Sequence, residues 1–194
     1  MLMMDTGMLG NGNRIINYIK AIGKKPTDIS YVIMTHADID HIGSAAEIKK
    51  VTGAKLAIHA GDAPILSDKI GFKTIRGPLK PLFKLMARVI RFNSVEPDFI
   101  LEDNIDIAGL KAIHTPGHTN GSICLYQRGK SIFGGDALRS DSDGNPRLPS
   151  KNLSADIVQA KASLIVIAEL EFDSLFPGHG APMIGQASAK LKNR

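Results

Sequence analysis

The chain has 194 residues, of which 43% are hydrophobic, and a formal net charge of +5. This length suffices for one domain with a sizeable core, so we expect a single domain spanning residues 1–194. The absence of an 18-residue apolar run argues against a membrane span, and the absence of a signal peptide, together with a single cysteine (Cys124), indicates a cytoplasmic protein without intramolecular disulfides.

The first sixty residues alternate between predicted strands and helices. The expected strands lie at 2–4, 31–34 and 54–59, and the expected helices lie at 13–22 and 43–52. The glycine-rich loop 7–13 lacks the Lys-Ser/Thr pair of a phosphate-binding loop, which argues against nucleotide binding. This β-α-β-α-β order predicts a sheet with helices packed against it.

Four potential metal ligands follow the apolar run 31–34 within six residues. They are His36, Asp38, Asp40 and His41. Imidazole and carboxylate donors together suit Zn²⁺, Fe or Mn²⁺ better than Ca²⁺. The competing interpretation is a polar helix-entry loop with capping aspartates, but that interpretation gives neither histidine a role. His59, at the end of the next strand, is more simply explained as a structural or solvent-facing residue.

Residues 71–92 do not fit the strand–helix alternation and predict a basic amphipathic helical insertion. Seven Lys or Arg and no Asp or Glu occur between Lys69 and Phe92. Apolar residues recur on one side of the predicted helix and basic residues on the other. The basic side is expected to be an ordinary solvated face, with a lid over an active site, a membrane-surface helix and a face for an anionic partner as alternatives.

The second half of the chain is predicted to be rich in strands. We expect strands at 99–101, 105–107, 110–113, 123–126, 131–133 and 174–176, a polar loop at 139–150, a helix capped by Ser154 that ends near 170, and a short basic helix from Gln186. Three further candidate ligands, each beside small turn residues, follow predicted strands: His118, Asp136 and His179. Small residues at such positions let the backbone approach closely.

Taken together, these motifs resemble the metallo-β-lactamase superfamily. The segment His36-Ala37-Asp38-Ile39-Asp40-His41 corresponds to the family's His-x-His-x-Asp-His, and His114-Thr-Pro-Gly-His118, Phe-Gly-Gly-Asp136 and Pro-Gly-His179-Gly follow in the family's order. The segment Asp5-Thr6-Gly7 also matches. The resemblance runs from about residue 5 to 182 and implies a four-layer αββα sandwich.

The resemblance also implies two divalent metal ions, most simply Zn²⁺, with Fe or Mn as alternatives. It assigns His36, Asp38 and His118 to one metal, assigns Asp40, His41 and His179 to the other, and makes Asp136 the bridge. Asp5 and His114 would be neighbours of the ligands or of the substrate rather than ligands. Asp40 would also hold or relay a proton during catalysis.

The activity implied by the resemblance is hydrolysis of a small ester, lactone or thioester by a hydroxide shared between the metals. The segment 114–122 is most similar to the glyoxalase II and lactonase branches. The alternatives are an iron-dependent oxygen-using enzyme similar to persulfide dioxygenases, and a phosphodiesterase or nuclease of the same fold. A nucleic-acid partner is not expected, because 194 residues leave no room for an additional binding domain.

Two departures from the family pattern stand out. Asp38 occupies a position where the family usually has histidine, and only four residues precede Asp5, where the family has opening strands. We therefore expect a short N-terminus without those strands. We also expect the resulting sheet edge to be covered, with a homodimer as one solution, because unpaired strand edges invite pairing with another chain.

Overall fold

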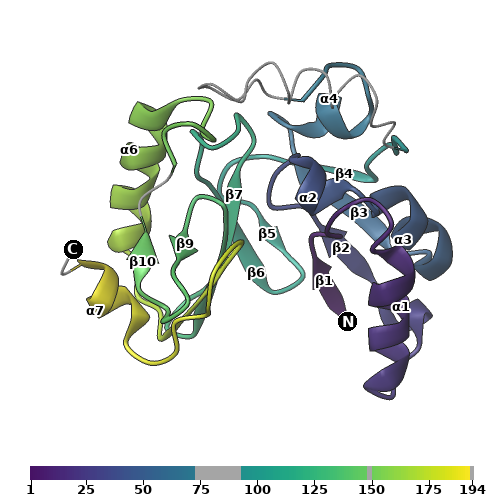
Figure 1. The fold of residues 1–194 in the computed structure, drawn as a ribbon, viewed down its shortest axis with the longest axis horizontal. Helices are drawn as coiled ribbons and strands as arrows, with labels where there is room; N and C mark the ends of the chain where they lie inside the picture. The colour runs from purple at the N-terminus through teal and green to yellow at the C-terminus, as the bar shows by residue number, and fades with distance from the viewer. Residues whose placement is uncertain (73–92, 148–149, 193–194) are drawn as a thin grey trace.

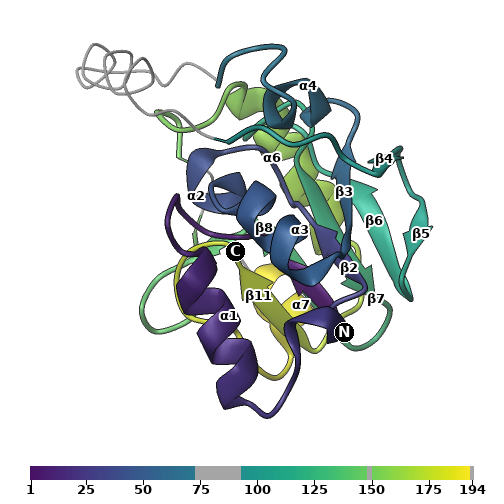
Figure 2. The ribbon, with the colours of Figure 1, turned by 90° about the vertical axis from the view of Figure 1, so that its right-hand side faces the viewer.

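The computed structural model describes residues 1–72, 93–147 and 150–192. Two β-sheets lie face to face, with helices on the outer side of each (Figures 1 and 2). This is the predicted αββα arrangement. The predicted insertion falls mostly at residues 73–92, which lie outside the described residues.

The first sheet contains four parallel strands from the N-terminal part of the chain. Its order is β1 (Leu2–Met4), β2 (Tyr31–Ile33), β3 (Lys55–His59) and β4 (Phe99–Leu101). The helical elements between these strands are α1 (Gly12–Ala21), the 3₁₀ turn η1 (Pro26–Asp28), α2 (Ile39–Ile42), α3 (Ala45–Thr52) and α4 (Ala63–Leu66). Parallel strands need such crossover segments.

The second sheet has five strands and mixed direction. Its order is β11 (Ser174–Pro177), β8 (Ser131–Gly135), β7 (Ile123–Gln127), β6 (Leu110–His114) and β5 (Asp106–Ile107). β11 pairs with β8 in parallel, and the other pairs are antiparallel. The outer helices are α6 (Ile157–Ala168) and α7 (Ala187–Lys192).

Side-chain alternation along the strands divides the core into three apolar clusters. In β2, Val32 packs outward toward α1 and α3, whereas Ile33 packs inward between the sheets. In β7, Leu125 joins the layer between the sheets and Cys124 joins the outer cluster with Ile167 of α6. A strand buried on both faces is expected to be apolar on both, as the run 31–34 is.

Two local predictions were wrong. The polar segment 139–150 contains a small antiparallel ribbon of β9 (Arg139–Ser140) and β10 (Pro146–Arg147). The N-cap of α6 is Asp156, whose carboxylate accepts hydrogen bonds from the backbone of Val158 and Gln159, whereas Ser154 is buried before the helix. An ionised carboxylate at an N-cap also interacts favourably with the helix dipole, which a serine hydroxyl does not.

Among the described residues, no helix combines the length and apolarity needed to cross a bilayer.

Candidate metal centre

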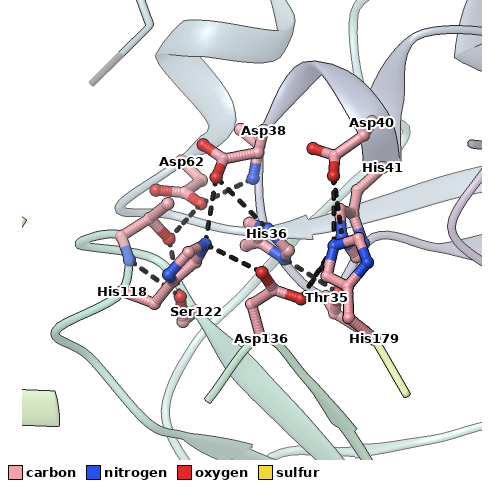
Figure 3. Close-up of polar contacts among 12 residues, drawn as sticks. Thr35, His36, Asp38, Asp40, His41, Asp62, His118, Ser122, Asp136 and His179 are labelled. Carbon is pink, nitrogen blue, oxygen red and sulfur yellow. Dashed lines mark hydrogen bonds and ion pairs between the residues drawn. The ribbon is translucent and has the colours of Figure 1, made fainter. Parts of the chain in front are cut away.

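The predicted ligand side chains gather at one edge of the sandwich, where strands of both sheets end (Figure 3). Two of the ligands, Asp40 and His41, lie in α2, which directly follows the loop after β2. The others follow the ends of β2, β6, β8 and β11: His36, Asp38, His118, Asp136 and His179. The structure brings these residues together, and their role as metal ligands stays a prediction.

The first ligand group consists of His36, Asp38 and His118. Oδ2 of Asp38 lies 3.6 Å from Nε2 of His36 and 3.0 Å from Nε2 of His118. Both histidines are buried, and the aspartate carboxylate is partly exposed. The donor atoms of this group all lie within 4.8 Å of one another. Asp38 therefore points into the group, as a histidine at this position would.

The second ligand group consists of Asp40, His41 and His179. Oδ2 of Asp40 lies 3.1 Å from Nε2 of His179 and 3.9 Å from Nε2 of His41. Here His41 is buried, whereas His179 and Asp40 are partly open to solvent. This group is the more accessible of the two.

Asp136 lies between the two groups and presents one carboxylate oxygen to each. Oδ1 is 3.5 Å from Nε2 of both His41 and His179, and Oδ2 is 3.5 Å from Nε2 of His118. Glycine at position 178 makes this placement possible, because a Cβ there would lie 2.3 Å from Oδ1 of Asp136. The two oxygens of this carboxylate therefore face different ligand groups.

The donor atoms fit a bound cation. Nε2 of His36, Nε2 of His41 and Oδ1 of Asp136 are buried without a hydrogen-bond partner, and leaving such groups unpaired is costly. Burial lowers the pKa of His41, but its interactions with Asp136 and Asp5 outweigh burial and raise the pKa to about 10. Burial raises the pKa of Asp136, but the surrounding histidines outweigh it and hold that pKa well below its ordinary value. The site thus favours positive charge at its centre.

Hydrogen bonds behind the ligands fix which ring nitrogen faces the site. Oδ2 of Asp5 accepts a hydrogen bond from the Thr35 hydroxyl and lies 2.8 Å from Nδ1 of His41. Because the Thr35 hydroxyl donates to Asp5, we assign Nδ1 of His36, 3.1 Å away, as the donor to its oxygen. Both histidines then direct Nε2 toward the centre, and Asp5 contacts His41 on the opposite side of its ring.

His114 lies apart from the centre, in a group with His59 and Asp103. Oδ1 of Asp103 lies 3.0 Å from Nε2 of His59 and 3.0 Å from Nδ1 of His114. The two rings are stacked, with centroids 4.0 Å apart and 20° between their planes. An ion must lie in the plane of an imidazole that binds it, so stacked rings are poorly placed to share one. In addition, Nδ1 of His59 accepts a hydrogen bond from the Gly61 amide and so carries no proton. A neutral imidazole that binds a metal through Nε2 must carry its proton on Nδ1, so His59 is not in the form that a metal ligand requires.

Sequence reasoning missed Asp62. This carboxylate is fully buried and contacts both ligand loops of the first group. The available signal was an aspartate two positions before Pro64, a pattern that is equally typical of an ordinary helix cap.

The chain is similar in sequence to a known protein family and to individual members of it. The sequence profile of the metallo-β-lactamase superfamily matches residues 2–179. The probable metallo-hydrolase YflN of Bacillus subtilis is 24% identical to this chain, over 95% of this chain and 77% of its own length. The human acyl-coenzyme A thioesterase MBLAC2 is 28% identical over 76% of this chain, and the alignment spans about half (54%) of that enzyme.

Solved structures show the same fold. BJP-1, a subclass B3 metallo-β-lactamase of Bradyrhizobium japonicum, superposes with a TM-score of 0.66 and 27% identity, covering 91% of this chain and 66% of that chain. TTHA1623, solved in a di-iron-bound form, superposes with a TM-score of 0.71 and 22% identity, covering 96% of this chain and 85% of that one.

Proposed function

The chain belongs to the metallo-β-lactamase superfamily, and from that premise we propose that it is a binuclear metal-dependent hydrolase of a small ester, lactone or thioester. One observation carries the proposal: the carboxylate of Asp136 presents one oxygen to each of two complete three-residue ligand groups.

In this proposal, the first group and the second group would each hold one divalent ion, and the carboxylate of Asp136 would be available to both groups. Bound there, such ions supply an acidified water as nucleophile and polarise the carbonyl oxygen of the substrate. The buried histidines His36, His41 and His118 would hold the ions in a partly dry environment, where electrostatic interactions with charge that develops during the reaction are stronger.

Asp40 is the residue proposed to hold a proton during turnover. Its carboxylate belongs to the second group, 3.1 Å from His179, and about a third of its side-chain surface is open to solvent (36%). A carboxylate in that position can accept a proton on the substrate side and exchange it with water. Asp136, which is buried, lacks that access to solvent.

Within the carbonyl class, a thioester is the substrate we favour. The support is the similarity to the acyl-coenzyme A thioesterase MBLAC2 at 28% identity. Zn²⁺ is the metal we favour for this chemistry, since it is a strong Lewis acid that accepts mixed nitrogen and oxygen ligands.

A second candidate function is an iron-dependent enzyme that uses oxygen. The observation in its favour is Asp38, which gives the first group a carboxylate in place of an imidazole. Carboxylate-containing sets of histidine ligands are typical of non-haem iron sites.

The test is metal analysis of protein purified without added metal, followed by assays with acyl thioesters, lactones and phosphodiesters. We expect two ions per chain and metal-dependent thioester or lactone cleavage, which Asp136→Ala abolishes while the domain stays folded. Asp28→Asn, a surface change remote from the ligands, is the matched control. Iron with oxygen consumption would select the second candidate, and absence of bound metal would overturn both.

A further inference from the structure

Asp62 is a buried aspartate whose carboxylate does not cap the helix that it precedes. It occupies the N-cap position of α4, yet its side chain makes no capping hydrogen bond there. Its exposed fraction is 0%, and no ion pair to it is formed within the described part of the chain. An ionised carboxylate in such a position is costly unless its oxygens accept strong hydrogen bonds.

Those hydrogen bonds come from the two loops that carry the first ligand group. Oδ2 of Asp62 accepts from the backbone amide of Ala37 at 2.8 Å and from the Thr119 hydroxyl at 2.6 Å. Oδ1 accepts from the backbone amide of Gly121 at 2.9 Å. Ala37 separates two predicted ligands, His36 and Asp38, and Thr119 directly follows the third, His118.

Neighbouring residues complete and orient this network. Because Thr119 donates its hydroxyl proton to Asp62, we assign the Ser122 hydroxyl, whose Oγ is 2.7 Å from Oγ1 of Thr119, as the donor to Thr119. Ser122 also accepts from the backbone amide of Thr119. The carboxylate approaches this closely because position 121 is glycine: a Cβ there would lie 2.7 Å from Cγ of Asp62.

We propose that Asp62 is a positioning residue that sets the geometry of the first ligand group, an inference that rests on the proposed metal-dependent function. Its carboxylate accepts hydrogen bonds from two backbone amides and one hydroxyl that lie beside the predicted ligands. In this way, one carboxylate holds the backbone beside all three ligands in register across two loops that are far apart in sequence. Partners behind metal ligands typically contribute 10- to 100-fold to metal affinity.

Asp62→Asn tests this because an amide cannot satisfy the same three donors. If the amide nitrogen takes the place of Oδ2 it faces the Ala37 N–H, and if it takes the place of Oδ1 it faces the Gly121 N–H. Either orientation sets two donors against each other. The loops must therefore move apart, although the side chain keeps its size.

The experiment measures Co²⁺ and Zn²⁺ affinity by chelator competition, with the Co²⁺ absorption spectrum as a second readout of ligand geometry. In a His179→Ala background, which disables the second group, we expect Asp62→Asn to weaken binding about 10- to 100-fold and to alter the spectrum. In a His118→Ala background, which disables the first group, we expect a change below about threefold.

The control variant is Asp98→Asn, which removes a carboxylate that accepts the Leu56 amide near the opposite end of β3. It should leave both affinities unchanged. If Asp62→Asn does not fold, two variants of Thr119 take its place. Thr119→Val removes the hydroxyl that donates to Asp62, and Thr119→Ser keeps a hydroxyl. Only the valine variant should weaken metal binding by the first group. An equal loss of affinity on Asp62→Asn in the two backgrounds, or equal effects of valine and serine, would overturn the role of Asp62. A wild-type protein that binds no metal would instead overturn the proposed function.

Discussion

The carboxylate of Asp5, the residue after β1, lies 2.8 Å from Nδ1 of His41 in α2. The same carboxylate accepts both the backbone amide and the hydroxyl of Thr35, and that hydroxyl contacts His36. One acidic residue from the first strand therefore orients two of the predicted ligands, each in a different ligand group.

Replacing Asp5 with asparagine should weaken metal binding in the second ligand group about 10- to 100-fold. An amide carries no charge to stabilise the Nδ1 proton of His41 and cannot accept from three donors as the carboxylate does. Chelator competition in a His118→Ala background measures the effect, with Asp28→Asn as a surface control. An affinity that stays at the wild-type level would show that His41 does not need this support.

Metal binding should release a proton from His41. The pKa of His41 in the metal-free protein is raised to about 10, so near neutral pH the ring is protonated and must lose a proton before Nε2 can bind an ion. Calorimetric titration in buffers of different ionisation enthalpy counts the protons released, and the apparent affinity should increase with pH up to about 10. Binding heats that do not depend on the buffer would contradict this.

The same shift sets the pH dependence of the metal-free protein. Because the pKa of His41 is higher in the folded state than its ordinary value of 6.5, the group stabilises the fold fully below pH 6.5. That contribution is lost as the pH rises through about 10. Urea unfolding of metal-free protein should therefore show declining stability over this interval, and a flat profile would exclude a stabilising role for the protonated ring.

Asp38→His should shift metal preference toward Zn²⁺ and away from Mn²⁺ and Fe²⁺. The change replaces a carboxylate oxygen 3.0 Å from His118 by an imidazole and removes one negative charge. Competition between Zn²⁺ and Mn²⁺ in a His179→Ala background gives the preference directly. Asp38→Asn removes the negative charge without adding an imidazole, so it separates the effect of charge from the effect of ligand type. An unchanged ratio of Zn²⁺ to Mn²⁺ affinity in Asp38→His would refute the expectation.

Gly178→Ala should weaken both ligand groups together. The new Cβ would lie 2.3 Å from Oδ1 of Asp136 and 2.8 Å from the backbone carbon of Gly135, so either the shared carboxylate or the strand end must move. We expect a loss of about 1–3 kcal/mol of stability in addition to reduced metal content. Gly71→Ala, where a Cβ meets no atom of the described residues within 4 Å, is the control. Full metal content in the Gly178 variant would contradict the sharing of Asp136.

Cys124 should resist alkylation in the native protein. Burial raises the pKa of its thiol to about 12, and the side chain is fully enclosed, so almost no thiolate exists at mildly alkaline pH. Mass spectrometry after iodoacetamide treatment should find the cysteine unmodified until denaturant is added. Rapid modification of folded protein would indicate local opening of the outer cluster of the second sheet.

Sequence patterns predicted most of the strands and helices because that information is local, whereas the αββα arrangement was expected through the family resemblance. The apolar run at 31–34 and the alternation in β7 depend on residues that are neighbours in the chain, and the positions of His118, Asp136 and His179 at strand ends depend on adjacent turn residues. The spatial proximity of these ligands was expected only through the family resemblance.

The interactions that sequence patterns did not reveal are those between distant segments. Asp62 is an N-cap by position, and only the folded chain shows that its carboxylate contacts residues 25 and 57–59 positions away. Likewise, Asp103 gains two histidine partners only when β3 and β6 come together. The sequence pattern predicted Ser154 as the cap of α6, but that serine is buried before the helix and Asp156 occupies the N-cap position.

The division of each ligand group between the two sheets has a mechanical consequence. Asp38 and His118 are 80 positions apart, so an ion held by both would act as a cross-link that closes a long loop. By analogy with a disulfide closing a loop of that size, the lost freedom of the unfolded chain corresponds to on the order of 4–5 kcal/mol. Loop-closure entropy grows only logarithmically with length, about 0.6 kcal/mol per doubling. The stretch of sequence between these two ligands can therefore lengthen or shorten substantially during evolution while the cross-link keeps nearly the same strength.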